Sequence, residues 1–182
     1  MQSMLFPTLR TKRLVLRPIA RTDTPFIVRH FLDPQVQRYL LDEEPFTTEA
    51  QAAAIIDFYL ERPDLPYNRW IVVRKSDGEP LGTCGFHRWN PQHRRAEIGY
   101  DLSPASWGHG YMREAVRAML AHGFGTLELH RIEAIVAVAN APSANLLCRL
   151  GFQREAILRD YYFRDGVFHD HQLFACLRGE ER

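Results

Sequence analysis

The sequence predicts a single-domain, mixed α/β layer fold in which helices cover a β-sheet. Apolar runs of strand length alternate along the chain with segments whose apolar residues recur every three or four positions, as on one face of a helix. The 182 residues fall in the usual range for one domain. No repeat or low-complexity linker divides them, so we expect one domain over residues 1–182.

Seven strands and about four helices are expected in chain order. The strands are expected near residues 13–20, 69–74, 80–88, 96–102, 131–140, 157–164 and 168–177. The helices are expected near residues 24–32, 48–61, from about 111 to the glycines at 123 and 125, and 142–150. Asp77-Gly78 and Asp165-Gly166 are typical of tight turns between paired strands.

The third helix is expected to begin at a glycine turn. Its apolar residues share one face: Met112, Ala115, Val116, Met119 and Leu120. Gly108 and Gly110 precede it and let the backbone turn tightly, so that free N–H groups and the positive end of the helix dipole converge on one point. Such a junction binds a pyrophosphate well, although Gly-x-Gly alone also fits a plain turn.

The following segment predicts a buried strand and a short helix. Residues 131–140 form an almost unbroken apolar run, as expected for a strand covered on both faces. Pro142 suits the first turn of a helix, and Gly151 suits the position just past its end.

Taken in order, the strand, the Gly-x-Gly helix, the apolar strand, Asn-x-x-Ser, the second helix and Leu150-Gly151-Phe152 resemble the GCN5-related N-acetyltransferases, or GNAT enzymes. Residues 9–18 and 159–166 are similar to the RimJ/RimL branch, the protein N-terminal acetyltransferases. The resemblance covers nearly the whole chain. It implies a mostly antiparallel sheet, acetyl-CoA as cosubstrate, a primary amine as acceptor and a homodimer as a frequent state.

Within this resemblance, a protein or peptide N-terminal α-amine is the preferred acceptor. Small-molecule amines, such as antibiotics or polyamines, are the alternative. A hypothesis of another class is a CoA-binding regulatory module without turnover.

The composition argues against several other classes of protein. The net charge is +1, and the basic residues are scattered arginines apart from Lys12 and Lys75, so nothing indicates nucleic-acid binding. No segment has the length and apolarity of a membrane span or signal peptide, so we expect a cytoplasmic protein. Cys84, Cys148 and Cys176 are far apart, which suits reduced thiols better than disulfides or a zinc site.

The resemblance assigns a set of residues to the cofactor. The backbone of residues 100–102 is expected to pair with the pantetheine arm like an added strand, and the N–H groups of residues 108–113 to hold the pyrophosphate. The expected cofactor-binding residues are Tyr100, Asp101, Leu102, Trp107, Gly108, His109, Gly110, Tyr111, Met112, Arg113, Asn140 and Asn145.

Two of these residues have structural alternatives, and one position departs from the family. Trp107 fits packing on the following helix better than shielding the cofactor, and Asn140 equally suits its own turn. Ala105 stands where the family pattern has Gln or Arg, which removes one polar cofactor contact.

Glu97 and Ser143 are the expected catalytic residues. The resemblance places Glu97 where histone-type GNAT enzymes carry a general base, and strand alternation turns it away from the apolar face. The alternative is an ordinary exposed carboxylate. Ser143 corresponds to a serine near the sulfur, or else it caps its own helix. Leu147 occupies the position of the family's tyrosine, so no tyrosine acid is expected on that helix.

Other polar clusters receive weaker assignments. His169-Asp170-His171 has no third ligand nearby in sequence, so no metal is expected. The candidates to receive a cationic amine are the acidic residues Asp42-Glu43-Glu44, Asp160 and Asp165.

Overall fold

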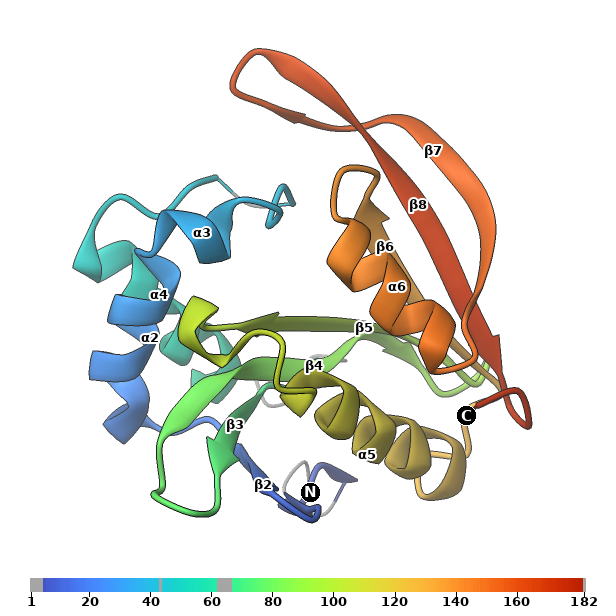
Figure 1. The fold of residues 1–182 in the computed structure, drawn as a ribbon, viewed down its shortest axis with the longest axis horizontal. Helices are drawn as coiled ribbons and strands as arrows, with labels where there is room; N and C mark the ends of the chain where they lie inside the picture. The colour runs from blue at the N-terminus through green and yellow to red at the C-terminus, as the bar shows by residue number, and fades with distance from the viewer. Residues whose placement is uncertain (1–4, 43, 62–66, 182) are drawn as a thin grey trace.

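The computed structural model describes residues 5–42, 44–61 and 67–181. In these residues eight strands form one sheet (Figure 1). They are β1 (Leu9–Arg10), β2 (Leu14–Pro18), β3 (Trp70–Arg74), β4 (Pro80–Asn90), β5 (Arg95–Leu102), β6 (Arg131–Ala137), β7 (Gln153–Arg164) and β8 (Val167–Leu177). The α-helices are α2 (Thr24–Phe31), α3 (Pro34–Gln37), α4 (Glu49–Glu61), α5 (Tyr111–Gly125) and α6 (Ala141–Arg149). Two short 3₁₀ helices are η1 (Arg21–Asp23) and η2 (Pro104–Ser106).

The sheet is mixed and mostly antiparallel, which confirms the predicted fold class. Its order is β1-β2-β3-β4-β5-β6-β8-β7, and among these neighbours β5 and β6 form the parallel pair. The strand count differs from the expected seven because β1 has only two residues, too few to show a periodicity. The four-residue helix α3, capped by Asp33, was missed for the same reason.

The sheet separates two apolar cores. Trp70 and Val72 of β3 belong to the core under α5 and α6, while Ile71 between them belongs to the core under α2 and α4. Ala96 and Ile98 of β5 enter the first core. Alternation therefore turns Glu97 toward the opposite face, as predicted.

Some strand boundaries differ from the expectation, whereas the helix α5 ends at Gly125 as expected, with Gly123 packed against the sheet, where an added Cβ would lie 2.9 Å from Ile132 and 3.0 Å from Phe86. The strand β6 ends at Ala137 rather than near residue 140, because residues 138 and 139 form a turn before α6. The strand β7 begins at Gln153, earlier than expected, because it pairs with β8 from that point. The hairpin of β7 and β8 extends past the rest of the sheet in Figure 1.

A buried polar network joins α2 to β4 and β5. The Asp101 carboxylate accepts hydrogen bonds from His30 Nε2 at 2.6 Å, from the Thr83 N–H at 2.9 Å and from the Thr83 hydroxyl at 2.6 Å. The other ring nitrogen of His30 lies 2.9 Å from the Ser103 hydroxyl. Burial opposes the charge of Asp101, but the hydrogen bonds and the charges of His30 and Arg69 outweigh it and lower its pKa. The network fixes the end of β5.

We expect Asp101→Ala to lower the free energy of unfolding by about 2–4 kcal/mol, because it leaves His30 and Thr83 buried without their acceptor. Since folding lowers the pKa of Asp101, its contribution is complete above the ordinary aspartate range and disappears as the pH falls through the lowered value. Urea unfolding at several pH values measures both effects. Asp77→Ala, which removes an exposed partner of Arg74, is the control, and an equal loss in both variants would contradict the network's role.

Candidate functional site

The strands β5 and β6 separate after a short paired segment. Their parallel pairing joins residues 95–97 to residues 131–133, and β6 then turns away from β5 (Figure 1). The other edge of β5 stays paired with β4 up to Leu102. Residues 98–102 therefore present a backbone edge to the opening, and an extended ligand can pair with such an edge like an added strand.

The glycine turn lies at the end of this opening. Gly108 and Gly110 have φ angles of 76° and 74°, in the left-handed region that favours glycine. Gly110 is the N-cap of α5 and provides no side-chain cap, so the first N–H groups of the helix are available to a ligand. An added Cβ on Gly108 would meet nothing within 4 Å, which leaves room for an anion.

Two residues from the connection between β1 and β2 hold this turn. The Glu114 carboxylate accepts from the Thr11 hydroxyl at 2.6 Å and from Arg13 N–H and Nε, each at 2.7 Å. Arg13 also donates to the His109 carbonyl at 3.0 Å and covers the Tyr111 ring at 4.6 Å. Sequence reasoning missed Arg13, which brings a half-exposed positive charge to the turn from about a hundred residues away.

The aromatic residues of the turn stabilise its shape. Trp107 is 48% exposed and donates its indole N–H to the Leu102 carbonyl at 2.7 Å, so its ring is tied to the end of β5 and is not buried. The His109 Nδ1–H donates to the Trp107 carbonyl at 2.7 Å, and the His109 ring stacks on Tyr111. Met112 is buried in the core, whereas Arg113 is exposed.

A hydroxyl pair crosses the opening between α6 and β5. Ser143 Oγ lies 2.7 Å from the Tyr100 hydroxyl. Asn140 caps α6 instead of Ser143, since its side-chain oxygen accepts from the Ser143 N–H at 3.2 Å. Burial raises the pKa of Tyr100, and the hydrogen bond to Ser143 opposes this only partly, so the phenol keeps its proton. The sequence prediction gave Tyr100 a backbone role and missed its hydroxyl. Of the other two residues of α6 discussed above, Leu147 is buried and Asn145 is exposed.

Glu97 lies on the opposite face, in a cleft of about 360 Å³. The cleft is lined by Arg88, Arg95, Ala96, Glu97, Glu133, Ile135, Leu158, Tyr161 and Leu173. The Glu97 side chain is 17% exposed, so it is not an ordinary exposed carboxylate. Burial raises its pKa, Asp42 and Glu133 raise it further, and Arg88 at 3.3 Å opposes the shift. A carboxylate with a raised pKa suits a general base.

Other titratable groups surround Glu97. His87 is its register partner on β4, and burial lowers the pKa of His87 to about 3, so the ring is neutral. Asp42 raises the pKa of both Glu97 and Tyr162 electrostatically, and its role toward the acceptor stays a prediction. Glu43 lies outside the described residues. The Asp160 N–H binds the Asp170 carboxylate, and the exposed Asp165 is 3.7 Å from Arg164.

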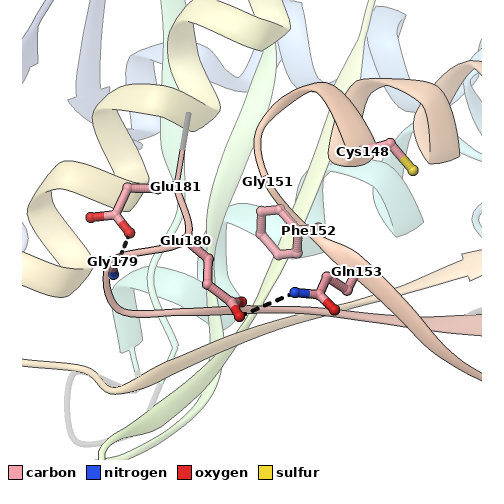
Figure 2. Close-up of a pocket in the computed structure, with 7 residues that line it drawn as sticks. All are labelled: Cys148, Gly151, Phe152, Gln153, Gly179, Glu180 and Glu181. Carbon is pink, nitrogen blue, oxygen red and sulfur yellow. Dashed lines mark hydrogen bonds between the residues drawn. The ribbon is translucent and has the colours of Figure 1, made fainter.

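A second cavity, of about 460 Å³, lies between the end of α6 and the end of β8 (Figure 2). Its carboxylates are already engaged: Glu180 accepts from the Gln153 amide at 3.1 Å and Glu181 from the Gly179 N–H at 2.7 Å. Cys148 at its edge is exposed, while Cys84 and Cys176 are buried. This cavity is larger than the Glu97 cleft but offers no group suited to amine activation among its described lining residues.

The remaining polar groups show no metal centre within the described ranges. No three or more His, Cys, Asp or Glu side chains there are grouped so that they could hold an ion. His171 is buried against Tyr162, with ring centroids 4.7 Å apart. No helix in the described part of the chain is long and apolar enough to cross a membrane.

Comparison with known proteins identifies relatives along nearly the whole chain. Residues 13–153 match the family described as the acetyltransferase (GNAT) domain. An uncharacterized N-acetyltransferase of Bacillus licheniformis is 40% identical over 95% of this chain and 97% of its own length. The spermidine N(1)-acetyltransferase of Escherichia coli is 28% identical over 85% and 81%, and the ribosomal protein uS5-alanine N-acetyltransferase of the same organism is 29% identical over 92% and 89%.

A solved structure of an N-acetyltransferase is similar to this chain over nearly its whole length. The spermidine N-acetyltransferase of Vibrio cholerae, crystallised with CoA and spermine, superposes with a TM-score of 0.82 at 25% identity, over 93% of this chain and 98% of that one.

We expect Glu114→Gln to loosen the glycine turn and to lower stability by about 1–2 kcal/mol, because it removes the charged acceptor of Thr11 and Arg13. Faster amide hydrogen exchange at residues 108–113 measures the loosening. Burial opposes the charge of Glu114, but the bonds from Thr11 and Arg13 hold its pKa below the usual value, so the stability difference disappears as the pH falls below that range. Unchanged exchange at neutral pH would contradict the role of this carboxylate.

Proposed function

The chain belongs to the GNAT acetyltransferase family and is an acetyl-CoA-dependent N-acetyltransferase, and from this premise we propose that its acceptor is the N-terminal α-amine of a protein or peptide. The observation that carries amine acetylation is the partly buried Glu97, which has a raised pKa and lies where β5 and β6 separate, and the arginines beside it carry the choice of acceptor. Acetyl transfer to an amine requires a group of this kind beside the reacting atoms.

The proposed cosubstrate site follows the opening from Tyr100 to α5. The backbone of residues 100–102 pairs with the pantetheine arm, and the N–H groups of residues 108–113 hold the pyrophosphate, with Arg13 beside them. Trp107, His109 and Tyr111 shape the turn, Asn140 caps α6, and Asn145 lies in the middle of that helix. The space above Gly108 and the uncapped helix end support this placement.

Glu97 is the proposed general base. An α-amine has a pKa of about 8, so it arrives mostly as an ammonium and must lose a proton before its nitrogen can attack. Glu97 accepts that proton, directly or through a water. When bound, acetyl-CoA supplies a thioester whose carbon forms the new C–N bond as its C–S bond breaks. After the C–N bond has formed, the nitrogen loses a second proton to water and keeps one hydrogen in the amide product, and Glu97 passes its own proton to solvent.

The hydroxyl pair is the proposed donor to the departing sulfur. Ser143 is hydrogen-bonded to Tyr100, whose raised pKa keeps the phenol protonated. Ser143 gives its proton to the thiolate and regains one from Tyr100, which exchanges with solvent. This pair takes the role of the tyrosine that the family carries at the position of Leu147.

The charges of the cleft favour an acceptor with one ammonium over a polyamine. The cleft holds Arg88 and Arg95 as well as Glu97 and Glu133, so a polycation would meet two guanidinium groups. The resemblance to the RimJ/RimL branch and the uS5-alanine relative support the same acceptor class. The spermidine-acetylating relative and the nearby Asp42 support a polyamine as the second candidate. A homodimer and a cytoplasmic location stay predictions from the resemblance.

We expect Glu97→Gln to lower kcat about 10²- to 10⁴-fold for peptide acceptors, because the amide cannot accept the ammonium proton. In the wild type, kcat falls on the acid side with a pKa above the ordinary glutamate value, and the variant loses this limb. Thiol release, measured with peptide, lysine and polyamine acceptors, gives both results and ranks the acceptor classes. Glu155→Gln, which changes an exposed partner of Arg131, is the control. An unchanged rate and pH profile would remove Glu97 from the mechanism.

We expect Gly110→Ala to weaken acetyl-CoA binding at least about tenfold, because a Cβ at this left-handed φ costs about 1–2 kcal/mol and displaces the N–H groups of the turn. Titration calorimetry measures the affinity. Gly125→Ala is the matched control, since Gly125 lies at the other end of α5, has open space around it and does not have a positive φ. Equal affinities in the two variants would argue against a phosphate site at the turn.

A further inference from the structure

Arg88 reaches Glu97 because of an irregularity in β4. The register of β4 with β5 shifts between His87 and Asn90, and Arg88 in this bulge has a φ of 50°. A left-handed conformation is strained for an arginine, and bulges beside active sites re-aim a side chain. Its guanidinium Nη1 lies 3.3 Å from the Glu97 carboxylate although the side chain is 59% exposed. An exposed ion pair of this kind contributes little stability, so it does not account for the bulge.

A second irregularity brings Tyr161 to the same arginine. The register of β7 with β8 shifts between Leu158 and Tyr162, and Asp160 within it has a φ of 50°. Tyr161 lines the cleft and, after Glu97, is the next group that raises the pKa of Arg88. Two bulges on strands far apart in the sheet therefore converge on one side chain at the mouth of the cleft.

The other charges lining the cleft are already paired. Glu133 accepts from Arg131 at 2.5 Å and from Arg95 at 3.4 Å. Arg131 in turn holds Glu155 at 2.6 Å. Among the described lining residues, Arg88–Glu97 is therefore the ion pair in which an incoming ammonium can replace the arginine.

This exchange sets a requirement on the acceptor. An ammonium that pairs with Glu97 displaces Arg88, which is then left with Tyr161 and no counter-charge. An acceptor that also carries a carboxylate replaces both members of the ion pair at once, so neither charge is left unpaired.

We propose that Arg88 is a specificity-determining residue that binds a carboxylate close to the acceptor's amine. This inference rests on the proposed function and adds to its α-amine the requirement of an anionic group within about one residue, which a free amino acid also meets. The carboxylate belongs either to an acidic side chain that follows the N-terminus or to the α-carboxyl of a free amino acid. Polyamines lack this group and are poor acceptors.

The test compares matched acceptors on one protein preparation. Peptide amides beginning Ala-Asp and Ala-Asn form one pair, and alanine and alaninamide form the other. We expect the wild type to have a kcat/KM about tenfold higher for the carboxylate-bearing member of at least one pair. The pair that shows the preference identifies the source of the carboxylate. Because each ratio is taken within one preparation, partial misfolding of a variant cancels.

Two variants separate Arg88 from general effects on the cleft. Arg88→Gln is expected to bring the ratio of kcat/KM within an acceptor pair close to one. Arg88→Lys is expected to retain part of the preference, because the positive charge remains. Arg95→Gln is the matched control, since Arg95 lines the same cleft but pairs with Glu133, and it is expected to keep the wild-type ratio. No preference in either wild-type pair, or a preference that survives in Arg88→Gln, overturns the inference. Turnover of α-amines without the preference leaves the proposed function standing, whereas no turnover of any α-amine overturns both.

Discussion

The separation of β5 from β6 is the constraint on which the rest of the site depends. Each strand is held on its outer side: β5 pairs with β4 up to Leu102, and β6 pairs with β8 from Arg131 to Ala137. The network of Asp101, His30 and Thr83 holds the end of β5 on the side of α2. Because each strand is fixed by other neighbours, the two can diverge after Glu97 without loss of the sheet, and the unpaired edge of β5 stays available to a ligand.

The same divergence distributes the reacting groups over two faces of one strand. Glu97 and Tyr100 are three residues apart on β5, so strand alternation places them on opposite faces. Ser143 reaches Tyr100 from α6 on one face, and Arg88 reaches Glu97 from β4 on the other. In the proposed mechanism the amine therefore loses its proton on one side of the strand while the sulfur gains one on the other.

Local sequence signals predicted the parts of the site that depend on local conformation. The glycines at 108 and 110, the amphipathic α5 and the outward face of Glu97 follow from backbone freedom and periodicity, and the structure contains each of them. The missed parts depend on long-range contacts or irregular backbone. Arg13 meets the turn from across the chain, and no glycine marks the bulge at Arg88. Tyr100 was predicted only for its backbone, because its hydroxyl partner lies 43 positions away.

The surroundings of the opening also favour direct transfer over a covalent acyl-enzyme. Of the three cysteines, Cys84 pairs in register with Tyr100 and therefore lies beside the proposed thioester site. Burial raises the pKa of its thiol, so the thiolate needed for attack is not populated at neutral pH. Cys148 borders the separate cavity near the C-terminus, and Cys176 is buried on β8 with a raised pKa of its own. In the proposed mechanism the nucleophile is therefore the acceptor's own nitrogen, so the ionisation of Glu97, and the arginine that opposes its raised pKa, control the proposed reaction.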